Sequence, residues 1–118
     1  MIQVGENKSV IEQAINNTPC LIIDCANRAN PHNFFQYQDY FHEVYIIEVE
    51  LMYKFRDVLK QSFTLINTLQ LKSIAITSWK YLFNYQNEKE NKEILLHAEE
   101  LITELSKHVL IYKGMSRE

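Results

Sequence analysis

Two short apolar runs of the chain end in or beside carboxylates. Asp24 lies near the end of the run CLIIDC, and Glu48 and Glu50 lie at the end of the run VYIIEVE. Carboxylates on neighbouring strands can hold a divalent cation for hydrolysis, and nucleases built this way typically carry a lysine two residues after one acid. Here Val49 and Glu50 follow Glu48, so that lysine is lacking. The acids could form a metal-dependent hydrolase site, but scattered acids at strand ends are the simpler interpretation.

A glycine, a lysine and a serine near the start of the chain resemble the end of a phosphate-binding loop. Only Glu6 and Asn7 separate Gly5 from the pair Lys8 and Ser9. Lys8 and Ser9 could hold a phosphate at a helix N-terminus. Because the chain has only 2 glycines, an exposed lysine beside an N-capping serine is the simpler interpretation.

Aromatic side chains gather in two places and could form a binding surface. In the first place, Arg28 and His32 are followed by the aromatic residues Phe34, Phe35, Tyr37, Tyr40 and Phe41. In the second place, near the end of a predicted strand, the aromatic residues are Trp79, Tyr81 and Phe83. Aromatics interleaved with cations can stack the bases of single-stranded nucleic acid. They can also cover a sheet or form a protein interface. Covering of the sheet is the simplest explanation, followed by an interface and then nucleic-acid binding.

Histidines and cysteines give no sign of a metal site. The 4 histidines show no ligand-like spacing, and neither cysteine joins them in a cluster. Cys20 and Cys25 should point to opposite faces of one strand, which predicts two separate buried thiols in a reducing cytosol. We therefore expect no metal and no cofactor.

The pattern of apolar residues predicts alternating strands and helices. Strands are expected at 2–4, 20–25, 44–49, 73–78 and 109–112, and helices at 9–17, 51–70 and around 94–105, with a polar loop or frayed helix start at 84–92. Strands separated by helices predict an α/β fold with three layers and a mainly parallel sheet that is covered on both faces. Residues 1–118 are expected to form one domain.

Composition restricts the classes of partner. The chain has 118 residues, a formal net charge of −3 and an isoelectric point of about 5.8. This balance argues against a dominant phosphate-binding surface, because non-specific nucleic-acid affinity depends on clustered Lys and Arg. The sequence shows neither a signal peptide nor an apolar run that is long enough to cross a membrane, so we expect a cytoplasmic protein.

In this order, the segments resemble the ATPase core of RecA/RadA-type recombinases. The run LIIDCANRANPHN is similar to the family's L-Y-I-D-T-E-G-x-F-R-P-E-R, with Ile23, Asp24 and Pro31 in register. The run SIAITSWKYLF is similar to L-V-V-I-D-S-x-x-x-L-F, and IQVG-ENKSVIEQAI resembles a strand, a shortened phosphate loop and its helix. The resemblance implies a minimal RecA-like core and suggests that the strands at Leu21 and Ile74 are central.

The departures from this family imply that its ATP chemistry is lost. Gly5, Lys8 and Ser9 span a loop that is too short to encircle a phosphate. The resemblance places Ala26 where the family has its water-activating acid, and Thr77 where it has the aspartate that positions Mg²⁺. We therefore expect a non-catalytic relative.

Three functions remain open from the sequence. The first is a binding protein that associates with itself or with a recombinase-type ATPase, as an accessory in DNA repair or recombination; single-stranded DNA is a weaker candidate partner. The second is a small metal-dependent hydrolase or nuclease that uses the strand-end carboxylates. The third is an assembly module whose free sheet edge pairs with another chain.

Overall fold

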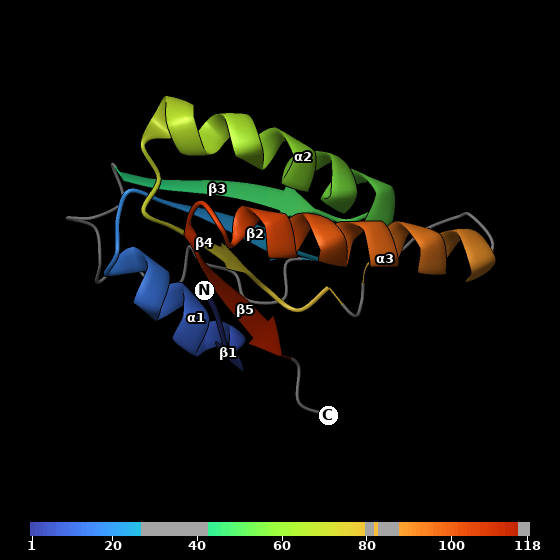
Figure 1. Cartoon of the computed structure of the whole chain (residues 1–118). Coiled ribbons are helices and arrows are strands. Elements are labelled where there is room, and N and C mark those ends of the chain that lie inside the picture. The colour runs from blue at the N-terminus through green and yellow to red at the C-terminus, as the bar shows by residue number, and fades with distance from the viewer. Residues whose placement is uncertain (27–42, 80–81, 83–87, 116–118) are drawn as a thin grey trace.

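The computed structural model describes residues 1–26, 43–79, 82 and 88–115 (Figure 1). Strands and helices alternate along most of these ranges, as the sequence pattern predicts; the exception is a pair of consecutive strands, 20–25 and 44–49, between which residues 27–42 are not described. The elements are β1 (Ile2–Glu6), α1 (Asn7–Ile15), β2 (Cys20–Cys25), β3 (Val44–Val49), α2 (Met52–Leu69), β4 (Ser73–Ile76), α3 (Glu88–Leu105) and β5 (Leu110–Met115). Within these ranges, no helix combines the length and apolar character that a membrane crossing requires.

All strand pairs of the described sheet are parallel. The strand order is β1-β5-β4-β2-β3. The predicted α/β class with a parallel sheet is therefore confirmed. Strands β4 and β2, which contain Ile74 and Leu21, lie in the interior of the sheet, while β1 and β3 form its edges. Every residue of β2 and β4 is buried, which explains their continuously apolar character.

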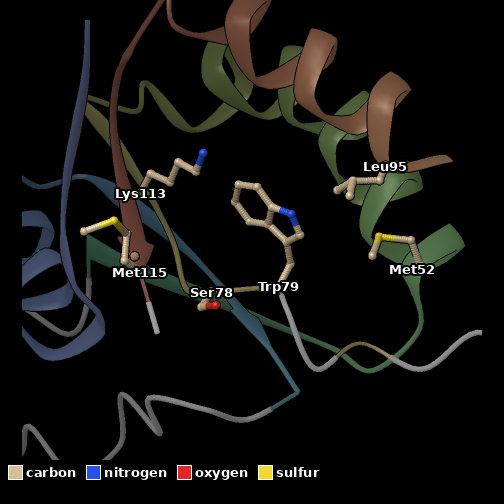
Figure 2. Close-up of a pocket in the computed structure, with 7 residues that line it drawn as sticks. Met52, Ser78, Trp79, Leu95, Lys113 and Met115 are labelled. Atoms are coloured by element: carbon tan, nitrogen blue, oxygen red, sulfur yellow. The ribbon is translucent and has the colours of Figure 1, made fainter. Parts of the chain in front are cut away.

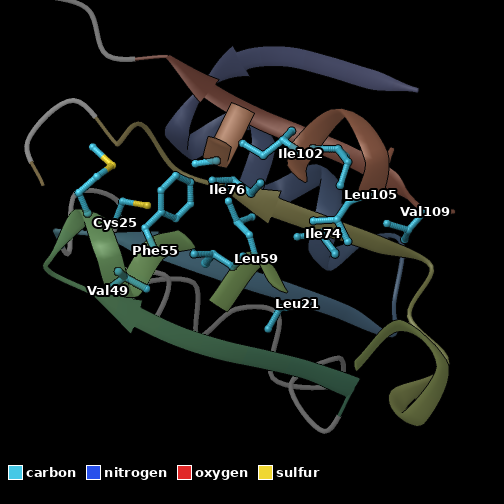
Figure 3. Packing of buried hydrophobic residues seen from close by; sticks show 14 of the residues in the cluster. Leu21, Cys25, Val49, Phe55, Leu59, Ile74, Ile76, Ile102, Leu105 and Val109 are labelled. Carbon is cyan, nitrogen blue, oxygen red and sulfur yellow. The ribbon is translucent and has the colours of Figure 1, made fainter. Parts of the chain in front are cut away.

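The helices cover the two faces of the sheet and create three layers (Figure 1). Helix α1 packs on one face, with Val10, Ile11, Ala14 and Ile15 buried against residues that include Ile22 and Ala75. Helices α2 and α3 pack side by side on the other face. Figure 3 shows Phe55 and Leu59 of α2 and Ile102 and Leu105 of α3 against Ile74 and Ile76 of β4.

The two cysteines lie on opposite faces, as predicted. Cys20 belongs to the cluster beneath α1, and Cys25 belongs to the cluster beneath α2 and α3. Both thiols are free and buried. Their separation by the thickness of the sheet explains why they cannot pair with each other.

The first helix differs from the prediction. It begins at Asn7 and ends at Ile15, whereas the sequence predicted a helix over 9–17. Its N-cap residue is Glu6, so Ser9 lies inside the first turn and is not the cap. The Ser9 hydroxyl instead accepts a hydrogen bond from Gln13 Nε2 at 3.1 Å. The prediction was wrong because β1 passes into α1 with no intervening loop.

Candidate functional site

The chain leaves two neighbouring interior strands in opposite directions. From β2 it continues to β3 on one side, and from β4 it continues through α3 to β5 on the other side. In doubly wound sheets, ligands bind at the carboxyl ends of the strands where this direction reverses. The residues after β2 and β4 therefore mark the first place to look for a site.

Thr77 joins the ends of these two strands. Its hydroxyl accepts the backbone N–H of Cys25 at 2.7 Å and lies 3.5 Å from Oδ1 of Asp24, to which it donates. The backbone N–H of Thr77 donates to the carbonyl of Ile23 at 3.1 Å. Asp24 and Thr77 are both fully buried. A neutral hydroxyl therefore holds the ends of β2 and β4 together.

Asn7 forms a second connection at the same edge of the sheet. Its side-chain oxygen accepts the backbone N–H of Ser78 at 2.9 Å. The carboxamide lies so close to Gly114 of β5 that a Cβ at this glycine would overlap Asn7 Oδ1. Asn7 thus connects the start of α1, across β5, to Ser78 in the segment that follows β4.

The three residues predicted as a degenerate phosphate loop do not form a loop. Gly5 belongs to β1, while Lys8 and Ser9 belong to the first turn of α1. The Lys8 side chain is exposed. Because strand and helix are contiguous here, the backbone has no turn that could aim successive N–H groups at a phosphate.

The predicted acids are partly brought together. Asp24 and Glu48 are direct partners in the register of β2 and β3, so their side chains share a face of the sheet. Asp24 is buried, whereas Glu48 and Glu50 are exposed, and Glu50 follows the strand. Within the described part of the chain, no group of three or more His, Cys, Asp or Glu side chains could hold a metal ion.

Ala26 adopts a left-handed conformation directly after β2. Its φ is 54°, and its backbone N–H donates to the carbonyl of Val49 at 2.6 Å. The turn after β2 is therefore tied to the end of β3. The side chain at this turn is a methyl group, which has no proton chemistry.

A cavity opens at the same edge, on the face that α2 and α3 cover. Its volume is about 480 Å³, and it is lined by Met52, Ser78, Trp79, Leu95, Lys113, Gly114 and Met115 (Figure 2). Three of these residues come from the end of β5, and the others come from the segment after β4 and from the facing helices. This volume lies within the range of small-molecule sites.

Trp79 forms the central wall of this cavity (Figure 2). The sequence favoured covering of the sheet for this residue, ahead of an interface or nucleic-acid contact, and the structure places it partly buried against the core. Its indole packs against Phe55 of α2, with ring centroids 5.4 Å apart and an interplanar angle of 30°. Lys113 Nζ lies 4.7 Å from the centroid of the same indole. Arg28, His32, Phe34, Phe35, Tyr37 and Tyr81, which were predicted as an interface or nucleic-acid surface, lie outside the described residues.

The pKa values of the two buried thiols are raised, which makes these thiols unreactive. Burial, with a smaller contribution from the charge of Glu43, raises the pKa of Cys20 to about 12. Burial also raises the pKa of Cys25, and the hydrogen bond from Thr77 only partly opposes that effect. Reactive cysteines need a lowered pKa, so both thiols are structural.

No family model matches the sequence, and no curated protein is significantly similar to it. What is established is a parallel α/β fold. Function must therefore be argued from the residues at the carboxyl edge of the sheet.

Sequence reasoning missed Lys113, Met115, Met52 and Leu95 as cavity residues. The prediction ended the last strand at Tyr112, whereas β5 continues to Met115. Had the strand been extended, the rule that parallel strands end at one edge would have placed Lys113 near Thr77. The helix residues had no comparable signal, because their apolar pattern indicates only core packing.

Proposed function

We propose that this chain is a non-catalytic relative of the RecA/RadA-type ATPase core, which acts by assembling with protein partners and does not hydrolyse ATP. In this proposal the chain associates with itself or with a recombinase-type ATPase, and it acts as an accessory in DNA repair or recombination. The context comes from the resemblance described above. The observation that carries the loss of ATP chemistry is the direct junction of β1 and α1, with Asn7 bound to Ser78.

The direct junction of β1 and α1 lacks two features that a phosphate loop needs. Phosphate loops present several backbone N–H groups and leave room for the phosphate beside them. Here the Asn7 carboxamide occupies the space above Gly114 and consumes the N–H of Ser78. Thr77, which the resemblance aligns with the Mg²⁺-positioning aspartate, is fully buried and already engaged with Cys25 and Asp24.

The free edge at β1 supports assembly. The N–H of Ile111 donates to the carbonyl of Met1, so the backbone groups of Ile2 and Val4 point away from β5. Two apolar side chains of β1 are exposed, Ile2 at 37% and Val4 at 54%. Exposed apolar edge strands pair with other chains unless they are protected. A second copy pairing β1 with β1 around a two-fold axis would close such an edge.

Thermal unfolding with ATP, ADP and GTP, each with and without Mg²⁺, tests the first part of the proposal. A ligand that binds the folded state must raise the apparent melting temperature. We expect no nucleotide to raise it. A rise of several degrees with any nucleotide would overturn the proposal, and a response to a single-stranded oligonucleotide in the same series would direct the search to DNA.

Light scattering on size-exclusion chromatography tests the second part. We expect the wild type to be a dimer and Val4→Asp to be a monomer, because a charge at the centre of β1 would be buried in the pair. Leu96→Asp, at a side chain of α3 that is 61% exposed, is the matched control and should remain dimeric. A monomeric wild type at high concentration would contradict self-association.

One observation favours a second function, a metal-dependent hydrolase. The register places Asp24 and Glu48 side by side at the carboxyl edge. This alternative predicts that Mg²⁺ or Mn²⁺ raises the melting temperature of the wild type and leaves Asp24→Asn unchanged. If neither ion stabilises the wild type, the alternative fails.

A further inference from the structure

The cavity beside Trp79 combines apolar walls with one cation. Met52 of α2, Leu95 of α3 and Met115 of β5 supply the apolar surface, as Figure 2 shows. Lys113 supplies the ammonium group, and it lies on the side of the sheet that α3 covers. Most of the surface that a ligand would contact is therefore apolar, and a single position carries positive charge.

Lys113 is half-buried and pairs with no carboxylate of the described residues. Its described contact is with the Trp79 ring. Lysines at such depth are usually paired, because burying an ammonium group without a counter-charge is costly. The position favours an anion that the structure does not itself supply.

Trp79 is fixed in position, which makes it a suitable wall for recognition. The stack on Phe55, which is fully buried in the core, limits the orientations of the indole. Aromatic walls that are already ordered bind planar ligands without a further loss of side-chain entropy. The cavity is thus pre-formed on its aromatic side.

We propose that this cavity binds a small organic anion with an aromatic or apolar body, whose carboxylate pairs with Lys113. The body packs between Met52, Leu95 and Trp79, and the anionic group lies at the end of β5. This site is independent of the edge-to-edge assembly proposed above, because it lies at the carboxyl ends of β4 and β5 and not along the outer edge of β1.

A second hollow on the other side of Trp79 and Lys113 is a poorer site for an anion. Its volume is about 310 Å³, and Glu99 and Thr103 of α3 line it together with Val4. The carboxylate of Glu99 would repel an anion there. Lys113 therefore directs an anionic ligand to the cavity at the carboxyl edge.

Trp79 is the single tryptophan of the chain, so its fluorescence reports directly on the cavity. The probes are 3-phenylpropanoate and its neutral amide, titrated into the full chain under selective tryptophan excitation. We expect a saturable change with the acid and at least about tenfold weaker binding of the amide, because only the acid makes a charge-assisted contact. The absence of a saturable change with the acid would overturn the proposal.

Two pairs of variants locate the binding. Lys113→Met keeps the length of the side chain and should reduce the affinity for the acid to that for the amide, whereas Lys60→Met, at an exposed lysine of α2, should not. Leu95→Phe should fill the cavity and block the acid, whereas Leu96→Phe, on the exposed side of α3, should not. Thermal unfolding of each variant checks that it is folded. Equal binding of acid and amide, or unchanged binding to Lys113→Met, would overturn the proposal.

Discussion

Asn7 Oδ1 accepts the backbone N–H of Ser78 at 2.9 Å, with Gly114 directly beneath the carboxamide. This hydrogen bond connects residues 71 positions apart in the sequence. It ties the start of α1 to the segment after β4 and leaves β5 between them. The space that it occupies can be probed by changing the glycine below it.

Gly114→Ala should destabilise the protein, because its Cβ would overlap the Asn7 side chain. We expect a loss of about 1–3 kcal/mol in the free energy of unfolding, as for overpacked cores. Gly5→Ala is the matched control, since its Cβ would lie 3.6 Å from Val10 Cγ1 in ordinary contact. Urea unfolding measures both, and equal effects would show that the close contact does not limit the site.

Asn7→Ala should remove the hydrogen bond to Ser78, and it should also remove the side chain that the Cβ of Gly114→Ala would overlap. Alone it should cost about 1–3 kcal/mol, because the part-buried N–H of Ser78 loses its acceptor. The double variant Asn7→Ala/Gly114→Ala should be clearly more stable than the sum of the two single losses predicts. Additive losses in this double-mutant cycle would contradict direct contact.

Thr77→Val should destabilise the junction of β2 and β4. The substitution keeps the shape but removes the oxygen that accepts the Cys25 N–H, so a buried donor is left unsatisfied. We expect a loss of about 1–3 kcal/mol in urea unfolding. Thr103→Val, whose hydroxyl bonds to the Glu99 carbonyl on an exposed helix face, should cost less than about 0.5 kcal/mol. A Thr77→Val protein as stable as the wild type would refute this role.

The buried Cys20 thiol should make stability depend on alkaline pH. Its pKa is about 12 in the folded chain against an ordinary value of 9.0, so the unfolded chain loses this proton first. The stabilisation is complete below pH 9.0 and is lost as the pH rises towards 12. The slope from one such thiol is at most about 1.4 kcal/mol per pH unit.

Urea unfolding of wild type and Cys20→Ala at neutral and alkaline pH measures this contribution. The variant has a lower overall stability because it leaves a cavity, but its stability should fall less steeply with pH. Tyrosine ionisation affects both proteins and cancels in the comparison. Parallel pH profiles would show that Cys20 does not contribute.

The interior of the fold follows closely from local sequence patterns. CLIIDC and VYIIEV form strands with the predicted bounds, and α2 differs from its prediction by one residue at each end, 52–69 against 51–70. These segments are long or uniformly apolar, so burial decides their structure. The boundary at α1 was wrong because N-capping by Ser9 was assumed, whereas the tertiary contact of Asn7 with Ser78 begins the helix earlier.

The candidate site was harder to predict because it depends on strand order. The sequence indicates which residues end strands, but the pairing of Asp24 with Glu48 and the closeness of Asn7 to Gly114 require the register of the whole sheet. Lys113 gave no signal of its own. Only its position at the end of β5, next to Trp79, makes it a candidate ligand-binding residue.

Among the described strands, β1 has one neighbour in the sheet, and that neighbour is β5, which follows all the others in the sequence. The partners Ile2 and Ile111, like Gly5 and Gly114, come from opposite ends of the described sequence. Such pairings have very high contact order, and loop closure over most of the chain must precede them. During synthesis, β1 therefore emerges before the other described strands, yet it has no partner among them until Met115 has followed it. The described sheet is complete only once β5 lies between β1 and β4.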